Sequence, residues 1–247
     1  VVYHLAAIAT TKESSMGWQN PIADYRANTL STLNLLRGLI ESNIRPQIIF
    51  TSSAAVYGEP EYIPIDERHP TNPQSPYGIS KLASEKYLLA YQKEYGLPVI
   101  IFRIFNCYGP RQTRYVMFDL LKKLKDDPHN LKVIGTGRQI RTYCYVSDVV
   151  NGLIMAQEKG VACKIFNLAG KDVISIKDLV DKILNITHLV GKTKVQYTGE
   201  SWKGDINMLV ADTTKIQNEL GFEATVSLEQ GLLKLKRWFE KEYGKIG

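Results

Sequence analysis

The 247-residue sequence predicts an α/β fold, in which a doubly wound parallel sheet is followed by a smaller C-terminal α/β lobe. Short apolar runs alternate with longer helical segments, and small or polar residues fill each turn from strand to helix. Hydrophobic residues make up 44% of the chain, which is enough for a substantial core. No apolar run nears the roughly 18 residues that a membrane span requires.

The first half of the chain alternates regularly between strands and helices. The apolar run Pro46–Thr51 is typical of a buried parallel strand. Ser75 and Pro76 predict a helix start, because serine caps a helix N-terminus and proline suits the first turn. The expected elements are a strand over 1–7, a helix over 21–42, a strand over 47–51, a helix over 76–95 and a strand over 98–103.

Beyond Tyr108 the pattern is less regular. We expect the apolar segment Lys164–Leu168 to return to the main sheet, so we divide the chain into residues 1–108 and 109–247, with 164–169 returning. The other elements expected here are helices over 115–126, 147–158, 176–185, 213–220 and 228–243, and a strand over 131–134 before a Gly-Thr-Gly turn.

Three polar residues predict the chemistry. Tyr77 and Lys81 lie four residues apart at the start of the 76–95 helix, and therefore on one face. A tyrosine is a poor base at neutral pH because its pKa is about 10, but a neighbouring ammonium favours the phenolate. Ser53 comes just past the 47–51 strand, where ligands bind in open α/β sheets. The trio predicts proton removal from an alcohol with hydride transfer to a nicotinamide, although Tyr-x-x-x-Lys alone also arises by chance on helices.

Further motifs in the same order make the chain resemble the extended short-chain dehydrogenase/reductases that act on nucleotide sugars. The motifs, from Val1 to about Gly231, are His4-Leu5-Ala6-Ala7, Asn28, Ser52-Ser53-Ala54-Ala55-Val56-Tyr57-Gly58, Tyr77-x-x-x-Lys81, Arg103-Ile104-Phe105-Asn106-x-Tyr108-Gly109-Pro110, Arg141-x-Tyr143 and Gly204-Asp205. The resemblance implies a Rossmann-type, NAD-binding domain in 1–108 and a mainly substrate-binding domain in 109–247.

The resemblance also implies a role for each matching residue. Tyr77 is the base, Lys81 keeps it ionised and bonds the nicotinamide ribose, and Ser53 bonds the reacting oxygen. The implied NAD-binding residues are Leu5, Ala6, Ala7, Asn28, Ser52, Tyr77, Lys81 and Phe105. On local grounds alone, Asn28 is equally an ordinary polar residue early in a helix, and Phe105 is equally a buried aromatic of a core strand.

The substrate implied by the resemblance is a nucleotide-diphosphate sugar. Ser53 contacts the sugar, Asn106 and Arg141 match positions that hold the diphosphate, and Asp205 matches a carboxylate that bonds the ribose. Arginine suits a diphosphate because its planar fork donates paired hydrogen bonds. The family pattern has an arginine three positions before the aspartate, where this chain has Trp202, so the identity of the nucleotide stays open.

The residues before Val56 favour one reaction within the family. Dehydratases and decarboxylases carry acidic residues where this chain has Ala54 and Ala55, so loss of the C5 proton and of water lacks its agents. We expect NAD-dependent epimerisation at C4 of a sugar of the UDP-glucose/UDP-galactose type, through a transient 4-keto sugar. A nucleotide-sugar dehydrogenase or reductase uses the same trio, and a non-catalytic nucleotide-sensing protein shares the fold. Both of these alternative functions stay open at this point.

The family's opening motif is missing from this sequence. A strand and a Gly-x-x-Gly-x-x-Gly turn normally place the cofactor pyrophosphate on a helix N-terminus. This chain opens on Val1-Val2-Tyr3, which resembles the fourth strand of the fold. We therefore expect a truncated chain with an exposed central strand and weak NAD binding.

Composition favours an enzyme of small molecules. The net charge of +6 comes from scattered lysines, which we interpret as solvated helix faces rather than a nucleic-acid site. The three cysteines and four histidines show no disulfide or ligand spacing, so we expect no metal and a cytoplasmic location. We expect no membrane partner, and the resemblance implies a homodimer formed by the helices at 21–42 and 76–95.

Overall fold

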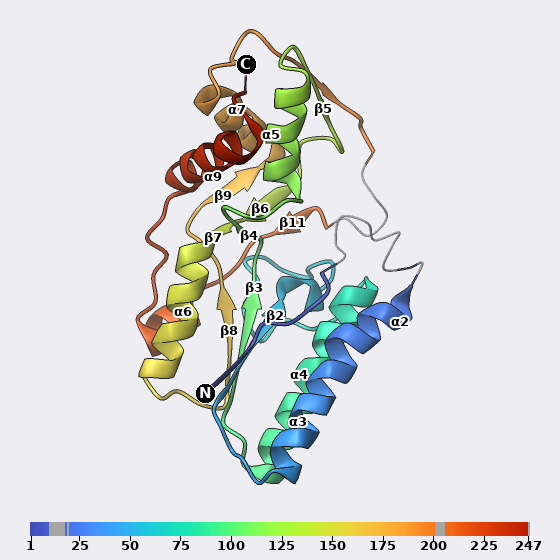
Figure 1. Cartoon of the computed structure of the whole chain (residues 1–247), viewed down its shortest axis with the longest axis vertical. Helices are drawn as coiled ribbons and strands as arrows, with labels where there is room; N and C mark the ends of the chain where they lie inside the picture. Colours follow the sequence, from blue (N-terminus) through green and yellow to red (C-terminus); the bar gives the residue numbers. More distant parts are fainter. Residues whose placement is uncertain (10–17, 19, 201–205, 247) are drawn as a thin grey trace.

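The structure is a computed structural model of the chain, and it describes residues 1–9, 18, 20–200 and 206–246. A parallel sheet in the order β1-β2-β3-β8 forms its centre (Figure 1). The strands are β1 (Val2–His4), β2 (Ile48–Ser53), β3 (Val99–Ile104) and β8 (Lys164–Leu168). The return of residues 164–168 to the main sheet is confirmed, because β8 pairs with β3. Within the described ranges β1 lies at the edge of this sheet.

Helices cover both faces of the sheet, as the apolar character of its strands requires. Helices α3 (Ser31–Glu41) and α4 (Pro76–Tyr95) lie side by side on one face, where Leu36 and Leu88 pack against strand residues (Figure 1). Helices α6 (Val146–Glu158) and α8 (Thr214–Leu220) pack on the other face, against Ile49, Ile100 and Phe102. The segments after residue 109 therefore contribute one strand to the main sheet and two helices that cover one of its faces.

The expected helix over 21–42 is continuous but not uniform. It runs through α2 (Pro21–Asp24) and the π-helical turn η2 (Tyr25–Leu30) into α3. A π turn leaves backbone carbonyls without their usual partners, and side-chain hydroxyls take them here. Thr32 Oγ1 and, from α4, Ser84 Oγ both donate to the carbonyl oxygen of Asn28. Helix α4 thus packs directly against the π turn.

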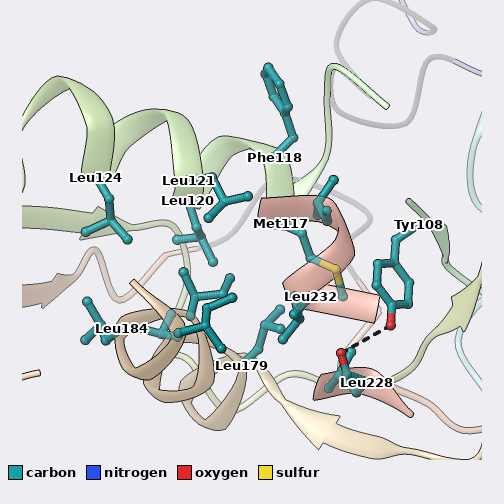
Figure 2. Close-up of a cluster of buried hydrophobic side chains, with 14 of the residues drawn as sticks. Tyr108, Met117, Phe118, Leu120, Leu121, Leu124, Leu179, Leu184, Leu228 and Leu232 are labelled. Atoms are coloured by element: carbon teal, nitrogen blue, oxygen red, sulfur yellow. Dashed lines mark hydrogen bonds between the residues drawn. The ribbon is translucent and has the colours of Figure 1, made fainter. Parts of the chain in front are cut away.

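The C-terminal lobe has its own leucine-rich core, drawn in Figure 2. Its helices are α5 (Val116–Asp126), α7 (Ile176–Ile186) and α9 (Leu228–Tyr243). Leu121, Leu179 and Leu232 bring one buried side chain from each helix, and Tyr108 Oη donates to the backbone oxygen of Leu228 over 3.4 Å. The short strands are β4 (Cys107–Tyr108), β5 (Asn130–Val133), β6 (Ile140–Thr142), β7 (Cys144–Tyr145), β9 (Val173–Ser175), β10 (Lys194–Tyr197) and β11 (Met208–Leu209).

The short strands join the lobe to the main sheet. β4 begins two residues after the end of β3 and pairs with β7. β6 pairs with β9 and β11. The carboxyl ends of β1, β2 and β3 consequently face the lobe. In the part of the chain that the structure describes, no helix is long and apolar enough to cross a membrane.

Candidate active site

A cavity of about 630 Å³ lies between the carboxyl ends of the main-sheet strands and the C-terminal lobe. Leu5, Ala7 and Ala9 line it after β1, and the residues 51–55 line it at the end of β2. Its far part is formed by α5, β6 and β11. Ser53, Tyr77 and Lys81, which the sequence predicts to act together, all line this one cavity.

A glycine brings Tyr77 close to Ser53. Tyr77 is the second residue of α4, whose N-cap Ser75 accepts a hydrogen bond from the amide of Gly78, as the sequence predicts. A Cβ at Gly78 would lie 2.6 Å from the carbonyl oxygen of Ala55 in the turn η3 (Ala54–Val56). Only glycine lets α4 begin this close to the end of β2. The Tyr77 phenol is accordingly hydrogen-bonded to the Ser53 side chain.

The ionisation of Tyr77 differs from the sequence-based expectation. Burial raises the pKa of Tyr77 to about 12, and the Ser53 hydrogen bond acts in the opposite sense but does not offset it. The expectation of a phenol held ionised by Lys81 is therefore not met in this structure. The reason is tertiary: removal of the phenol from water outweighs the Ser53 hydrogen bond and the charge of Arg114. The charges of Tyr115 and Asp24 raise the pKa of Tyr77 further.

Lys81 is almost completely buried, with 2% of its surface exposed. Its Nζ donates to the backbone oxygen of Thr51 over 2.7 Å and lies 4.7 Å from the centroid of the Phe50 ring. Burial lowers the pKa of Lys81 to about 8, and the charge of Glu85 acts in the opposite sense. Lys81 is consequently an ammonium at neutral pH, anchored to β2 within the same cavity as Tyr77.

A buried polar network supports this end of the cavity from behind. Glu85, one turn after Lys81 on α4, accepts hydrogen bonds from Ser52 Oγ over 2.5 Å and from Arg103 Nη2 over 2.8 Å. Arg103 Nη1 in turn donates to Tyr57 Oη, which donates to Asn167 Oδ1. Ser52, expected to bind the cofactor, is committed to Glu85 as well as lining the cavity.

The sequence assigned no role to Glu85 or to Arg103. Two signals were present in the chain: a carboxylate at the i+4 position from Lys81, and an arginine inside the apolar strand Val99–Ile104. Buried charges require a partner, so the pair could have been inferred from these two positions.

The residues expected to bind NAD fall into two groups. Leu5 and Ala7 line the cavity, whereas Ala6 is exposed and lies outside its lining. Asn28 holds this segment in place from the π turn: its Oδ1 accepts from the amide of Ile8 over 2.9 Å, and its Nδ2 donates to the Ile8 carbonyl over 3.0 Å. These two hydrogen bonds to Ile8 distinguish Asn28 from an ordinary polar residue early in a helix.

Phe105 lies elsewhere. It is fully buried in a cluster with Val56, Tyr57 and Ile65, and it is not among the residues that line the cavity. Its placement matches the alternative interpretation, that of a core aromatic. Because the residue directly follows β3, its side chain points into the protein while the next residue, Asn106, lines the cavity.

Asn106 and Arg141, expected to hold the diphosphate, both line the cavity. Asn106 has φ 27° and its Nδ2 donates to the carbonyl oxygen of Thr142. Arg141 Nη1 donates to the carbonyl oxygens of Ile140 and Asn207. The structure thus brings together an amide and a guanidinium at the lobe side of the cavity, while Asp205 lies outside the described residues.

Known proteins resemble this chain in sequence and in fold. The sequence profile of the GDP-mannose 4,6 dehydratase family matches residues 1–235. The chain is 30% identical to YtcB of Bacillus subtilis, described as an uncharacterized UDP-glucose epimerase, over 94% of this chain and 72% of that protein. The UDP-glucose 4-epimerase of Thermotoga maritima, solved with UDP-glucose, is 32% identical with a TM-score of 0.89, over 98% of this chain and 77% of that chain.

A relative of different activity matches almost as well. The dTDP-glucose 4,6-dehydratase DesIV of Streptomyces venezuelae, solved with NAD bound, is 25% identical with a TM-score of 0.86, over 98% of this chain and 73% of that chain. The chain belongs to the family of NAD-dependent nucleotide-sugar epimerases and dehydratases, within the extended short-chain dehydrogenase/reductases. The family and the Rossmann-type α/β fold expected from the sequence are confirmed.

Proposed function

We propose that this protein is an NAD-dependent nucleotide-sugar 4-epimerase, which interconverts sugars of the UDP-glucose/UDP-galactose type through a transient 4-keto sugar. The observation that carries the proposal is the set of side chains at one end of the cavity. Ser53, Tyr77 and Lys81 lie there with Ala54 and Ala55, and among the described lining residues the one carboxylate, Asp119, comes from α5. This set supports proton transfer at a hydroxyl, and the two positions before Val56 carry alanines rather than the acidic residues that acid-assisted loss of water would use.

NAD is the proposed cofactor, and the residues at this end of the cavity fit it. The small side chains of Ala7 and Ala9 leave room beside the segment that Asn28 braces, and the Lys81 ammonium offers a donor to a ribose hydroxyl. When bound, NAD supplies a hydride acceptor and a positively charged ring that favours ionisation of a nearby phenol.

Tyr77 is the proposed base. It takes the proton of the C4 hydroxyl as the hydride leaves C4, and it returns a proton to the oxygen when the hydride is delivered to the other face of the ketone. Ser53 bonds the same oxygen, since its hydroxyl already contacts Tyr77. Because burial holds the pKa of Tyr77 near 12 in the protein alone, the phenol needs nearby positive charge to act at neutral pH.

Lys81 supplies part of that charge. With a pKa of about 8 it is protonated at pH 7, and its contact with Thr51 fixes the ammonium one helical turn from Tyr77. On the lobe side, Asn106 and Arg141 are the proposed diphosphate ligands, and Asp205 is the proposed ribose ligand. Leu209 also lines the cavity, so its size bears on which sugars are accepted.

A nucleotide-sugar dehydrogenase or reductase is the second candidate, because the same three residues serve both reactions. Product analysis separates them. The complete gene product is supplied with NAD and with UDP-glucose or UDP-galactose, and the sugars are followed by NMR. An epimerase interconverts the two sugars without accumulating NADH. Stoichiometric NADH identifies a dehydrogenase instead, and no change in either sugar contradicts both proposals.

A homodimer is also proposed, formed by the helices that cover one face of the sheet. Ile22, Tyr25, Ile79 and Tyr87 of α2, η2 and α4 are large apolar side chains left exposed on these helices. Light scattering after size exclusion tests the dimer, with Tyr87→Asp expected to shift the mass toward a monomer. If the wild-type protein is a monomer, the proposal of a homodimer is wrong.

A further inference from the structure

Tyr115 has a backbone conformation that ordinary residues avoid. It precedes α5 as the N-cap residue, with φ 73° and ψ 168°. This region of conformational space belongs to glycine, because the Cβ of any other residue crowds its own backbone. Where such a residue persists, the surrounding structure must hold it in place. A tyrosine here costs stability that glycine would not cost, so its side chain is expected to serve a purpose other than folding.

The contacts that the Tyr115 side chain makes within the protein are weak ones. The guanidinium of the exposed Arg114 lies 5.4 Å from the centroid of its ring. No side-chain hydrogen bond from it caps α5. The phenol extends instead to the segment after β1, where Oη donates to the backbone oxygen of Ala9 over 3.3 Å. A single long hydrogen bond between half-buried groups adds little net stability, because water replaces it in the unfolded chain.

The Tyr115 phenol lies at the end of the cavity that holds Ser53, Tyr77 and Lys81, the catalytic end. Tyr115 lines the cavity together with Tyr77 and Ser53. Ala9, which accepts the hydrogen bond from Tyr115, lines the cavity as well. Tyr115 is also one of the groups whose charge acts on the pKa of Tyr77, after burial and the Ser53 hydrogen bond. The strained backbone therefore places an aromatic side chain from the lobe beside the reacting groups.

We propose that Tyr115 is a sugar-positioning residue whose ring packs against the hexose of a nucleotide sugar next to Tyr77. The inference rests on the proposed function and deepens it. A hexose has apolar C–H faces and hydroxyl groups around its rim, so an aromatic ring face suits it. A 4-epimerase holds its keto sugar in two orientations, and a flat apolar wall contacts the sugar in either one.

Three variants test the proposal. Tyr115→Gly removes the ring and relieves the strain, and Tyr115→Phe keeps the ring but removes the bond to Ala9. His188→Gly is the matched control, because His188 also has a positive φ of 60° but is exposed and lies outside the cavity lining. The readouts are the urea midpoint, KM and kcat with UDP-glucose, and the saturation-transfer NMR signals of UDP-glucose.

The expected results separate stability from binding. Tyr115→Gly keeps a urea midpoint no lower than that of the unchanged protein, because glycine accepts the conformation, while its KM rises about tenfold or more and kcat changes little. The saturation-transfer signals of the glucose protons fall relative to those of the uracil. Tyr115→Phe keeps a KM near the original, and His188→Gly leaves KM unchanged.

Any of three outcomes overturns the proposal. The first is an unchanged KM in Tyr115→Gly, and the second is a lowered urea midpoint, which means that the side chain holds the fold. The third is an equal rise of KM in Tyr115→Phe, which assigns the effect to the hydroxyl. A failure of the proposed function is seen separately, as absence of sugar interconversion by the unchanged protein, and the NMR signals still report on Tyr115 in that case.

Discussion

The guanidinium of Arg103 and the carboxylate of Glu85 form a two-point ion pair behind the catalytic end of the cavity. Nη2 lies 2.8 Å from Oε2 and Nε lies 3.1 Å from Oε1, and both side chains are almost completely buried. Burial alone would lower the pKa of Arg103, but the hydrogen bonds and charge of Glu85 more than offset this and raise it. The pair fastens α4 to β3, and Ser52 fastens it to β2.

Breaking this ion pair on one side is expected to destabilise the protein strongly. Arg103→Met leaves the Glu85 carboxylate buried without its main partner, at a cost of about 3–5 kcal/mol in the free energy of unfolding. Urea unfolding at pH 7 measures it. The double variant Glu85→Met/Arg103→Met is expected to recover most of the loss, because two apolar side chains need no partner. A double variant no more stable than Arg103→Met contradicts the account.

Lys81 is expected to weaken the fold that it serves. Its pKa falls from 10.5 in the unfolded chain to about 8 in the folded protein, so the penalty for its buried charge is complete below pH 8 and disappears as the pH rises toward 10.5. Lys81→Met is therefore expected to raise the free energy of unfolding at pH 7 by about 1–3 kcal/mol, with some of the gain lost with the Thr51 hydrogen bond. Activity is lost at the same time.

The pH dependence of this difference is the sharper measurement. Urea unfolding of Lys81→Met and of the unchanged protein is compared from pH 7 to pH 10.5, and the advantage of the variant should shrink across that window. Lys86→Met, which replaces an exposed lysine of the same helix, serves as the control. An advantage that stays constant with pH means that the charge of Lys81 is not its cause.

Gly78 is expected to be essential for activity because of the contact behind it. Gly78→Ala places a methyl group 2.6 Å from the Ala55 carbonyl oxygen, which must move α4 away from η3 and part Tyr77 from Ser53. We expect kcat to fall about 100-fold or more, as for other small displacements of reacting groups. Gly38→Ala on the exposed face of α3 is the control: nothing lies within 4 Å of its Cβ. A Gly78→Ala enzyme with normal kcat would refute the argument.

His4 is expected to make the fold sensitive to mild acid. Burial and the charge of Lys81 lower the pKa of His4 to about 4, and its Nε2 is paired with Thr32 Oγ1. Above pH 6.5 the ring is neutral in both the folded and the unfolded chain, so His4 does not penalise folding. As the pH falls from 6.5 toward 4, the unfolded chain binds a proton that the folded protein does not, and the free energy of unfolding falls by up to about 3 kcal/mol. His4→Gln should flatten the pH dependence of unfolding in this window. An unaltered slope shows that other groups are responsible.

Much of the fold could be predicted from local sequence. Helix α4 begins at Pro76 and ends at Tyr95 as expected, because Ser75 caps one end and Gly96 takes a left-handed conformation at the other. The π turn at 25–30 could not be predicted, since it is held partly by Ser84 from another helix. The two- and three-residue strands of the lobe are too short to show a period.

The site was predictable in composition but not in electrostatics. Ser53, Tyr77 and Lys81 meet in one cavity because strand ends and the start of α4 are fixed by local signals. The pKa of Tyr77 depends on how deeply the folded chain buries it, and no spacing in the sequence reports burial of one phenol. Phe105 was assigned to cofactor binding from a motif, but the structure buries it in the core after β3.

The central claim is that Tyr77 carries the proton in epimerisation at C4. The most direct measurement is the rate of UDP-glucose and UDP-galactose interconversion by Tyr77→Phe, followed by NMR, with the urea midpoint and UDP-glucose affinity measured on the same sample. We predict a rate lower by about three orders of magnitude or more, with folding and affinity retained, since one acid–base group contributes roughly 10²–10⁴-fold. A Tyr77→Phe enzyme that interconverts the sugars at an undiminished rate would contradict the account.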